Sequence, residues 1–172
     1  MTAFVAVTLA IVTLALVYFG MQKGWQNKLK SQKAATAPVE NLDYKLGELK
    51  GTFDGVYVAT VYTEKPLERI AQYNLGIKNR ATLAVYENGL VFEKEPQDVF
   101  IPNTAITKVG TTMGMIGKFV AKGKVLTIGW NLGDIAVETG FTIEPGRKTD
   151  TAPIADIQRL IEETVDNTIS VK

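Results

Sequence analysis

The hydrophobic pattern divides the chain into three parts. An unbroken apolar run opens the chain, short stretches rich in β-branched and aromatic residues follow, and an apolar stripe at helical spacing lies near the end. These patterns predict a membrane span, β-strands and an amphipathic helix, respectively. We therefore expect a transmembrane helix over residues 3–21, a basic flank and linker over 22–49, and a β domain with a closing helix over 50–168.

The first run carries no charge from Ala3 to Gly20, and ten of its eighteen residues are Leu, Ile, Val or Phe. As a helix it is ~27 Å long, close to the thickness of a hydrocarbon core. Those ten residues favour insertion by about 3 to 6 kcal/mol in total. A buried core helix or a cleavable signal peptide are the alternatives. A signal peptide needs a basic start and a small-residue cleavage site, whereas Tyr18-Phe19-Gly20 is a poor one. An uncleaved span is the favoured interpretation.

The flank of this run predicts its orientation. Lys23, Lys28, Lys30 and Lys33 follow the span with Trp25 among them, and no basic side chain precedes it. The positive-inside rule then places the C-terminal side in the cytoplasm and a two-residue tail outside. The same lysines are attracted to anionic headgroups. We expect a single-pass protein of the cell membrane, with the lipid bilayer as its first partner.

Residues 34–41 are small, polar and interrupted by Pro38, as in a linker. The next part predicts about seven short strands. Asn88-Gly89 between two of them is typical of a hairpin with a type I′ turn, because both residues tolerate a positive φ. The candidates for these strands are eight stretches, namely residues 56–62, 81–86, 90–93, 99–101, 105–109, 119–121, 124–130 and 135–143.

The last strands and the final helix show which faces are buried. Leu126, Ile128 and Trp130 alternate on one face of their strand. A face of the next strand carries Ile135, Val137, Phe141 and Ile143. The helix begins near Pro153, and its apolar stripe consists of Ile154, Ile157, Leu160, Ile161 and Val165. Such a helix can cover the open end of a small antiparallel barrel or sandwich.

Seven antiparallel strands and a closing helix describe the pleckstrin-homology (PH) superfold. The chain resembles the small actinobacterial membrane proteins with a bacterial PH-like domain, which are often loosely labelled transporters or export proteins. The resemblance covers residues 53–143 and the N-terminal span, and it implies a PH-like β-barrel or sandwich. One helix cannot enclose a polar path, so a transport role is not expected. The resemblance is found in five sequence segments, residues 55–60, 75–83, 100–102, 123–130 and 138–141.

The amino-acid composition excludes several kinds of catalytic and metal-binding site. The chain has no Cys and no His, so disulfides, thiolate or imidazole metal ligands and the usual general base are absent. Residues 1–33 carry a net charge of +4, and the remainder, with fifteen basic and eighteen acidic residues, carries −3. A domain of that charge has no general attraction for nucleic acid. We expect no catalytic centre, no cofactor and no nucleic-acid partner.

Two motifs resemble ligand-binding sites, but each is better explained without a ligand. Residues 110–118 resemble a phosphate-binding loop, but Thr112 stands where that motif needs glycine and Phe119 where it needs Ser or Thr. We interpret this segment as an inter-strand loop. The acids Glu93, Glu95 and Asp98 offer oxygen ligands but not a six-oxygen cage, and they suit the solvated end of a hairpin. We therefore expect no metal.

Basic side chains supply the candidate binding residues. Lys118, Lys122 and Lys124 surround a predicted turn, and Met113, Met115, Ile116 and Phe119 beside them could dip into a membrane interface. The alternative interpretation is an ordinary solvated turn. Lys78 and Arg80 form a weaker second cluster.

Two functions remain open from the sequence. The first is a membrane-anchored PH-like binding or scaffold module on the cytoplasmic face, which recognises a protein segment or a lipid headgroup. Anionic headgroups are one class of such lipid ligands. The second is a non-catalytic accessory subunit of a larger complex, whose helix packs against another membrane protein. Ala3, Ala6, Ala10 and Ala15 would allow close helix approach.

Overall fold

The computed structural model describes residues 2–31, 46–116, 118–119, 125–143 and 153–170. Its contacts divide the chain into two compact units, residues 1–33 and 34–172. The predicted linker, residues 34–41, lies outside the described residues.

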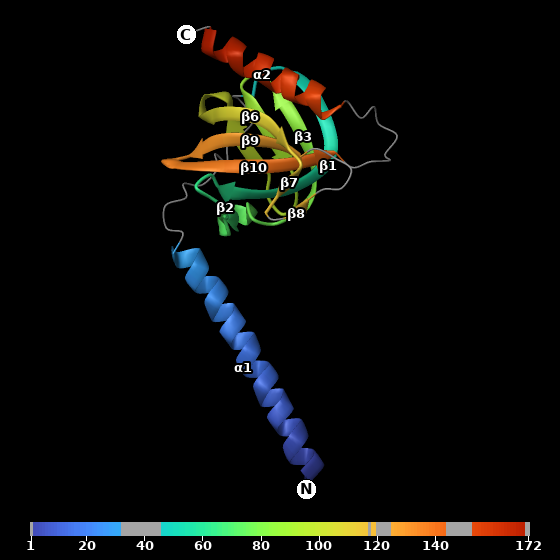
Figure 1. Ribbon diagram of the computed structural model, residues 1–172, viewed down its shortest axis with the longest axis vertical. Coiled ribbons are helices and arrows are strands. Elements are labelled where there is room, and N and C mark those ends of the chain that lie inside the picture. Colours follow the sequence, from blue (N-terminus) through green and yellow to red (C-terminus); the bar gives the residue numbers. More distant parts are fainter. Residues whose placement is uncertain (1, 32–45, 117, 120–124, 144–152, 171–172) are drawn as a thin grey trace. The chain divides into compact units, whose positions relative to one another are not determined.

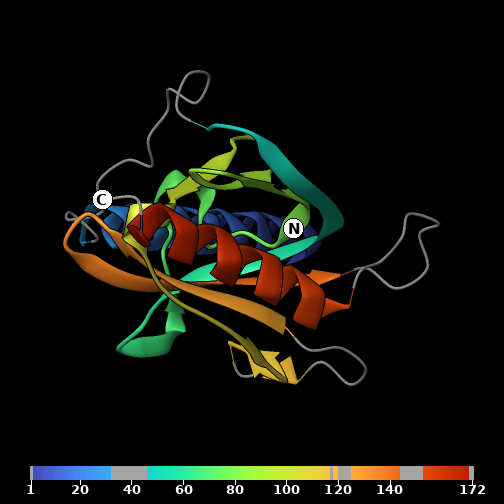
Figure 2. The same ribbon diagram turned by 90° about the horizontal axis from the view of Figure 1, so that it is seen from above.

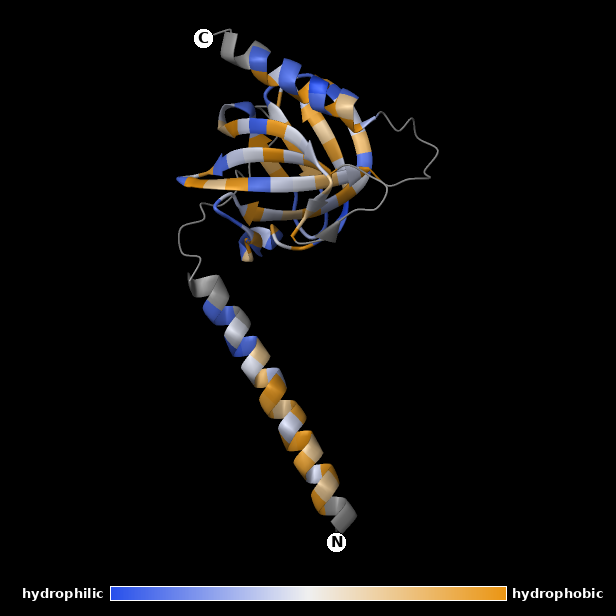
Figure 3. Cartoon of the chain, in the orientation of Figure 1, coloured by the Kyte–Doolittle hydropathy of each residue, from blue (hydrophilic) through white to orange (hydrophobic). Residues whose placement is uncertain are grey.

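The first unit is a single helix, α1, which runs over Thr2–Ser31. Apolar residues dominate its N-terminal part, and hydrophilic residues appear toward its C-terminal end (Figure 3). The stretch Val5–Gly24 is long and apolar enough to cross a membrane by length and composition, a test that a signal sequence also passes. Its apolar side chains are exposed, and the Thr13 hydroxyl donates to the Leu9 carbonyl at 2.9 Å. The hydroxyl therefore brings no unsatisfied donor to the surface of the helix.

The second unit is mainly β and antiparallel, with a helix at its end (Figure 1). Eight strands form one sheet in the order β5-β4-β3-β1-β10-β9-β6, with β2 paired to β1, and β7 and β8 form a separate hairpin. The strands are β1 Leu49–Tyr62, β2 Lys65–Arg69, β3 Asn79–Tyr86, β4 Gly89–Glu93, β5 Val99–Pro102, β6 Ile106–Thr112, β7 Gly114–Met115, β8 Lys118–Phe119, β9 Val125–Leu132 and β10 Ile135–Ile143. The remaining elements are the 3₁₀ turns η1 Gln72–Asn74 and η2 Asn103–Ala105, and helix α2 Ile154–Ser170.

Strand β1 joins the two halves of the sheet. Its first part, from Leu49 to Tyr57, pairs with β3, and its second part, from Gly55 to Tyr62, pairs with β10. Gly55 lies where both pairings overlap, and a Cβ there would collide with the Thr142 carbonyl and the Phe141 ring. A residue without a side chain lets the two half-sheets approach at this bend.

The main differences from the predicted strands concern short elements and the first strand, since β1 begins at Leu49 rather than at Val56. Strand β2 and turn η1 lie in a part of the chain for which we predicted no element. The phosphate-loop-like segment, predicted as an inter-strand loop, is largely strand, because its residues extend β6 and form the β7–β8 hairpin. The predicted strand over 119–121 is described only at Phe119, which belongs to β8.

The hairpin predicted at Asn88-Gly89 is present, but its turn is not of type I′. Tyr86 pairs with Gly89, so the loop is Glu87-Asn88, and neither Asn88 nor Gly89 has a positive φ. The turn is instead held by backbone bonds from Glu87 and Asn88 to residues 48 and 46. Gly89 is required for another reason, since a Cβ there would lie 2.5 Å from the Phe100 ring. Close packing on β5, rather than turn geometry, selects this glycine.

The core confirms the predicted faces. Leu126, Ile128 and Trp130 of β9 are buried, together with Val137 and Phe141 of β10, while Ile135 and Ile143 pack at its edge. Helix α2 inserts Ile157 and Ile161 fully, with Ile154, Leu160 and Val165 beside them, and packs on β6 and η2. Seen from above, α2 lies across one end of the sheet (Figure 2). Burying its apolar stripe covers β6 and η2, the turn that connects the two edge strands β5 and β6.

Asn103 in η2 links α2 to the sheet. Its side-chain amide donates to the Glu87 carbonyl at 2.8 Å and to the Thr164 carbonyl of α2 at 3.4 Å. Its backbone N–H donates to the Asn88 carbonyl at 3.1 Å. One buried side chain thus positions the β3–β4 turn and the closing helix together.

Candidate functional site

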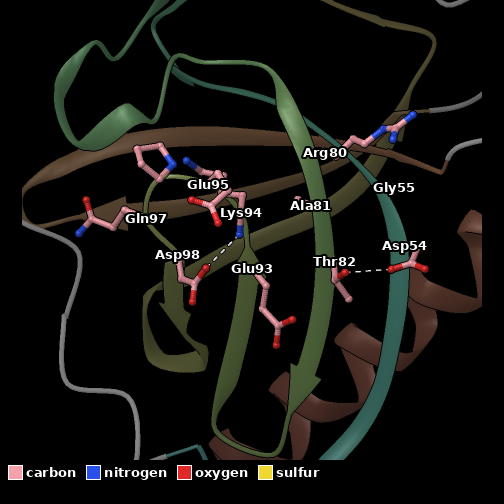
Figure 4. Close-up of a pocket in the computed structure, with 11 residues that line it drawn as sticks. Asp54, Gly55, Arg80, Ala81, Thr82, Glu93, Lys94, Glu95, Gln97 and Asp98 are labelled. Atoms are coloured by element: carbon pink, nitrogen blue, oxygen red, sulfur yellow. Dashed lines mark hydrogen bonds between the residues drawn. The ribbon is translucent and has the colours of Figure 1, made fainter.

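A pocket of about 540 Å³ lies on the outer face of strands β1, β3 and β4. The pocket is lined by Asp54 and Gly55 of β1, by Arg80, Ala81 and Thr82 of β3, by Glu93 at the end of β4, and by residues 94–98 after it (Figure 4). Its volume is in the range of ordinary ligand sites. We call it the outer-face pocket.

Strand register builds the centre of the pocket. Asp54 lies opposite Thr82, and Thr82 lies opposite Glu93, so three polar residues form one row across β1, β3 and β4. The Thr82 hydroxyl donates to Asp54 Oδ1 at 2.9 Å. Leu83 and Phe92, their chain neighbours, are fully buried on the opposite face. At this row, alternation along each strand therefore separates the polar side chains of the outer face from the core.

Lys94 closes the inner wall of the pocket. Its backbone N–H donates to Asp98 Oδ1 at 2.9 Å, and only 6% of the residue is exposed. Its ammonium group donates to the Asn74 carbonyl at 3.3 Å and lies 5.1 Å from the centre of the Tyr57 ring. Burial lowers the pKa of Lys94, and the carboxylate of Asp98 opposes that shift. The Lys94 ammonium group is thus held inside the domain and is not exposed at the rim of the pocket.

A buried hydrogen-bond network lies beneath Lys94. The Tyr57 hydroxyl lies 2.5 Å from Thr60 Oγ1 and donates to the Leu75 carbonyl at 3.2 Å. Thr60 Oγ1 lies 2.7 Å from Thr139 Oγ1, which also accepts from Trp130 Nε1 at 2.8 Å. The network connects β1, β9 and β10 with the segment after η1, and every side chain in it is buried. It supports the pocket from the core side.

Burial of Tyr57 predicts a loss of stability at alkaline pH. Burial raises the pKa of Tyr57 above its ordinary value of 10.0, although the hydrogen bond with Thr60 opposes the shift. Above pH 10 the unfolded chain loses this proton while the folded domain keeps it, so the unfolded state binds fewer protons and stability falls as pH rises. Below pH 10 the contribution is fully present. We expect the free energy of unfolding to fall by up to about 1.4 kcal/mol per pH unit from this group.

Urea unfolding of the full chain in mild detergent at a series of pH values from 8 upward measures this effect. The matched variant is Tyr57→Phe, which keeps the ring. It should be less stable at neutral pH, and its stability should decline less steeply above pH 10. Parallel curves for the two proteins would contradict the assignment.

The predicted basic residues are only partly brought together. Arg80 is exposed and lines the outer-face pocket, whereas Lys78, also exposed, is not part of the lining. Lys118 lies in β8, but its side chain, like Lys122 and Lys124 as a whole, lies outside the described residues. Of the flank, Lys23 is exposed on α1. Trp25, Lys28 and Lys30 lie in α1 without described side chains, and Lys33 lies outside the described residues.

One expectation about the β7–β8 region is wrong. Met115 was expected to reach a membrane interface, but only 9% of it is exposed. Its side chain packs over Gly140, where even a Cβ would collide with the Met115 sulfur. Met113, just before β7, is 69% exposed. Of these two methionines, Met113 is therefore exposed and Met115 is buried.

The acidic residues belong to the site in a way that the sequence analysis did not anticipate. Glu93, Glu95 and Asp98, interpreted as a solvated hairpin end, all line the outer-face pocket. Within the part of the chain that the structure describes, no three acidic side chains are grouped so as to hold a metal ion. Asp54 and Lys94 were missed. Lys94 carried a signal, because it continues the inward alternation of Leu90 and Phe92.

Comparison with known proteins agrees with the fold. A family model described as bacterial PH domain-like matches residues 36–157. No curated protein matches the chain significantly. Among solved structures, one of Vav1 inhibited by an allosteric inhibitor is 13% identical, with a TM-score of 0.39. That match covers 86% of this chain and 34% of the Vav1 chain, so this chain spans about a third of that length. Nothing about activity or partners transfers at this level of similarity.

Proposed function

Because the chain belongs to the bacterial PH domain-like family, we propose that it is a membrane-anchored, non-catalytic binding module on the cytoplasmic face of the cell membrane. Its ligand is a protein segment or a lipid headgroup. The observation that carries the proposal is the outer-face pocket, where Arg80, Glu93 and Glu95 surround a hollow on a rigid sheet. Arg80 and Glu93 are held on strands, and charged groups positioned in this way recognise a ligand without a change in the fold.

The helix α1 supports the membrane part of the proposal. Its large apolar side chains between Val5 and Met21 are exposed, from 49% at Val12 to 72% at Met21. Contact with lipid removes that surface from water, at about 25 cal/mol per Å². Anchoring then confines the domain to a thin layer beside the bilayer and raises its effective concentration toward ligands there.

Cysteine labelling tests location and orientation together. The chain has no Cys, so single variants Thr2→Cys and Asp134→Cys report one site each. Asp134 is exposed in the β9–β10 turn. In intact cells a membrane-impermeant maleimide should label Thr2→Cys, and should label Asp134→Cys only after permeabilisation. Labelling of Asp134→Cys in intact cells would place the domain outside and contradict the proposal.

Gentle extraction separates the module from an accessory subunit. Size analysis of the full chain in mild detergent should give a largely monomeric species if the protein binds its ligand transiently. A discrete assembly of fixed stoichiometry would favour the accessory role, in which α1 packs against other membrane helices.

A further inference from the structure

We propose that the outer-face pocket binds a lysine or arginine side chain presented by an extended segment of a partner protein. This rests on the proposed function, since it takes the same pocket as the binding site and names the class of its ligand. Of the two ligand classes proposed above, the inference favours a protein segment over an anionic lipid headgroup.

The shape of the pocket suits an inserted side chain. Thr82, a short residue, stands at the centre of the polar row between Asp54 and Glu93. Residues opposite each other on neighbouring strands have Cβ atoms about 5 Å apart, so the row spans roughly 10 Å. The longer side chains of Arg80 and Glu95 line the same pocket (Figure 4). The short Thr82 side chain leaves room at the centre of the row, within the pocket.

The charges around this hollow favour a cation. Four carboxylates line the pocket, from Asp54, Glu93, Glu95 and Asp98, against the two cations Arg80 and Lys94. The Lys94 ammonium is turned inward to the Asn74 carbonyl and the Tyr57 ring. Glu93, Glu95 and Asp98 are exposed, and Arg80 is the one exposed cation among the described lining residues. An entering ammonium or guanidinium group therefore meets a net negative rim.

The same charges disfavour a lipid phosphate. Recognition of anionic headgroups uses clustered Lys and Arg. Here a phosphate that enters the pocket would meet the carboxylates of Glu93 and Glu95 as well as Arg80, because all three residues line it. Like charges at short range are repelled unless a cation lies between them. Arg80 thus has opposite effects in the two cases: it hinders a basic segment and would help an anionic lipid.

Binding of a short peptide of alternating lysine and alanine tests the inference. The full chain is placed in nanodiscs of phosphatidylcholine, and fluorescence anisotropy of the labelled peptide gives its Kd. The double variant Glu93→Gln, Glu95→Gln should weaken binding about tenfold. Arg80→Gln should strengthen it by roughly two- to fivefold, and added salt should reduce all of these effects.

A second double variant controls for general charge attraction. Glu162→Gln, Glu163→Gln changes the net charge equally on exposed residues of α2 that do not line the pocket, and should leave the Kd unchanged. The inference would be overturned by any one of three results: no binding of the lysine peptide, an equal loss of affinity in both double variants, or weaker binding after Arg80→Gln. If a glutamate–alanine peptide or nanodiscs with anionic lipid bind instead through Arg80, the inference fails while the binding-module proposal stands. Labelling that places the domain outside the cell would overturn the proposed function itself.

Discussion

Replacing Thr139 by valine is expected to reduce the free energy of unfolding by about 2–4 kcal/mol. Valine keeps the shape of threonine but removes the oxygen that accepts from Trp130 Nε1 and pairs with Thr60 Oγ1. Both partners are buried, so neither regains a bond to water. Urea unfolding of the full chain in mild detergent, followed by circular dichroism, measures the loss.

Two further variants show whether the loss comes from the network. Thr107→Val makes the same chemical change at an exposed position of β6 and should alter stability by less than about 0.5 kcal/mol. Combining Thr139→Val with Trp130→Phe removes donor and acceptor together, so the double variant should lose less than the sum of the two single losses. Strict additivity, or an equal effect of Thr107→Val, would show that the network contributes no coupling.

Arginine at two positions of α1 is expected to remove the protein from the membrane. Leu9 and Leu14 lie within the apolar stretch and are 67% and 70% exposed. Each arginine near the centre of a span costs about 2.5–3.5 kcal/mol, so Leu9→Arg with Leu14→Arg offsets the roughly 3 to 6 kcal/mol that favours insertion. The variant should leave the carbonate-resistant membrane fraction, where the parent chain should be found.

The matched control adds the same charges at the polar end of the helix. Gln26→Arg with Asn27→Arg strengthens the basic flank and should retain full membrane association. Retention of the Leu9→Arg, Leu14→Arg protein in the resistant fraction would contradict the span. A mature chain that begins beyond Gly20, seen by intact mass, would identify a signal sequence instead.

Much of the architecture could be predicted because it follows from local periodicity. The uncharged run from Ala3 to Gly20 lies in α1, and Leu126, Ile128 and Trp130 share a buried face of β9. The spacing of Ile157 and Ile161 correctly predicted the buried side of α2. In each case a few consecutive residues decide the outcome, since a side chain's direction repeats every two residues in a strand and every three to four in a helix.

The outer-face pocket could not be predicted in the same way. Asp54 meets Thr82, and Thr82 meets Glu93, only through the registers of β1 on β3 and of β3 on β4. Register depends on which strands pair and how they slide, and β1 changes partner along its length. Local sequence patterns therefore could not show that these carboxylates surround one pocket.

The sequence by itself determined the apolar helix, the β domain and the closing amphipathic helix, because each depends on the order of polar and apolar residues within one short segment. Only the tertiary structure decided the site. In the folded domain Lys94 lies in the interior beside Tyr57, and Thr60 contacts Thr139, 79 positions away in the chain. Close packing also requires glycine at position 89. These contacts join residues far apart in the chain, and their energies arise only when separate strands meet.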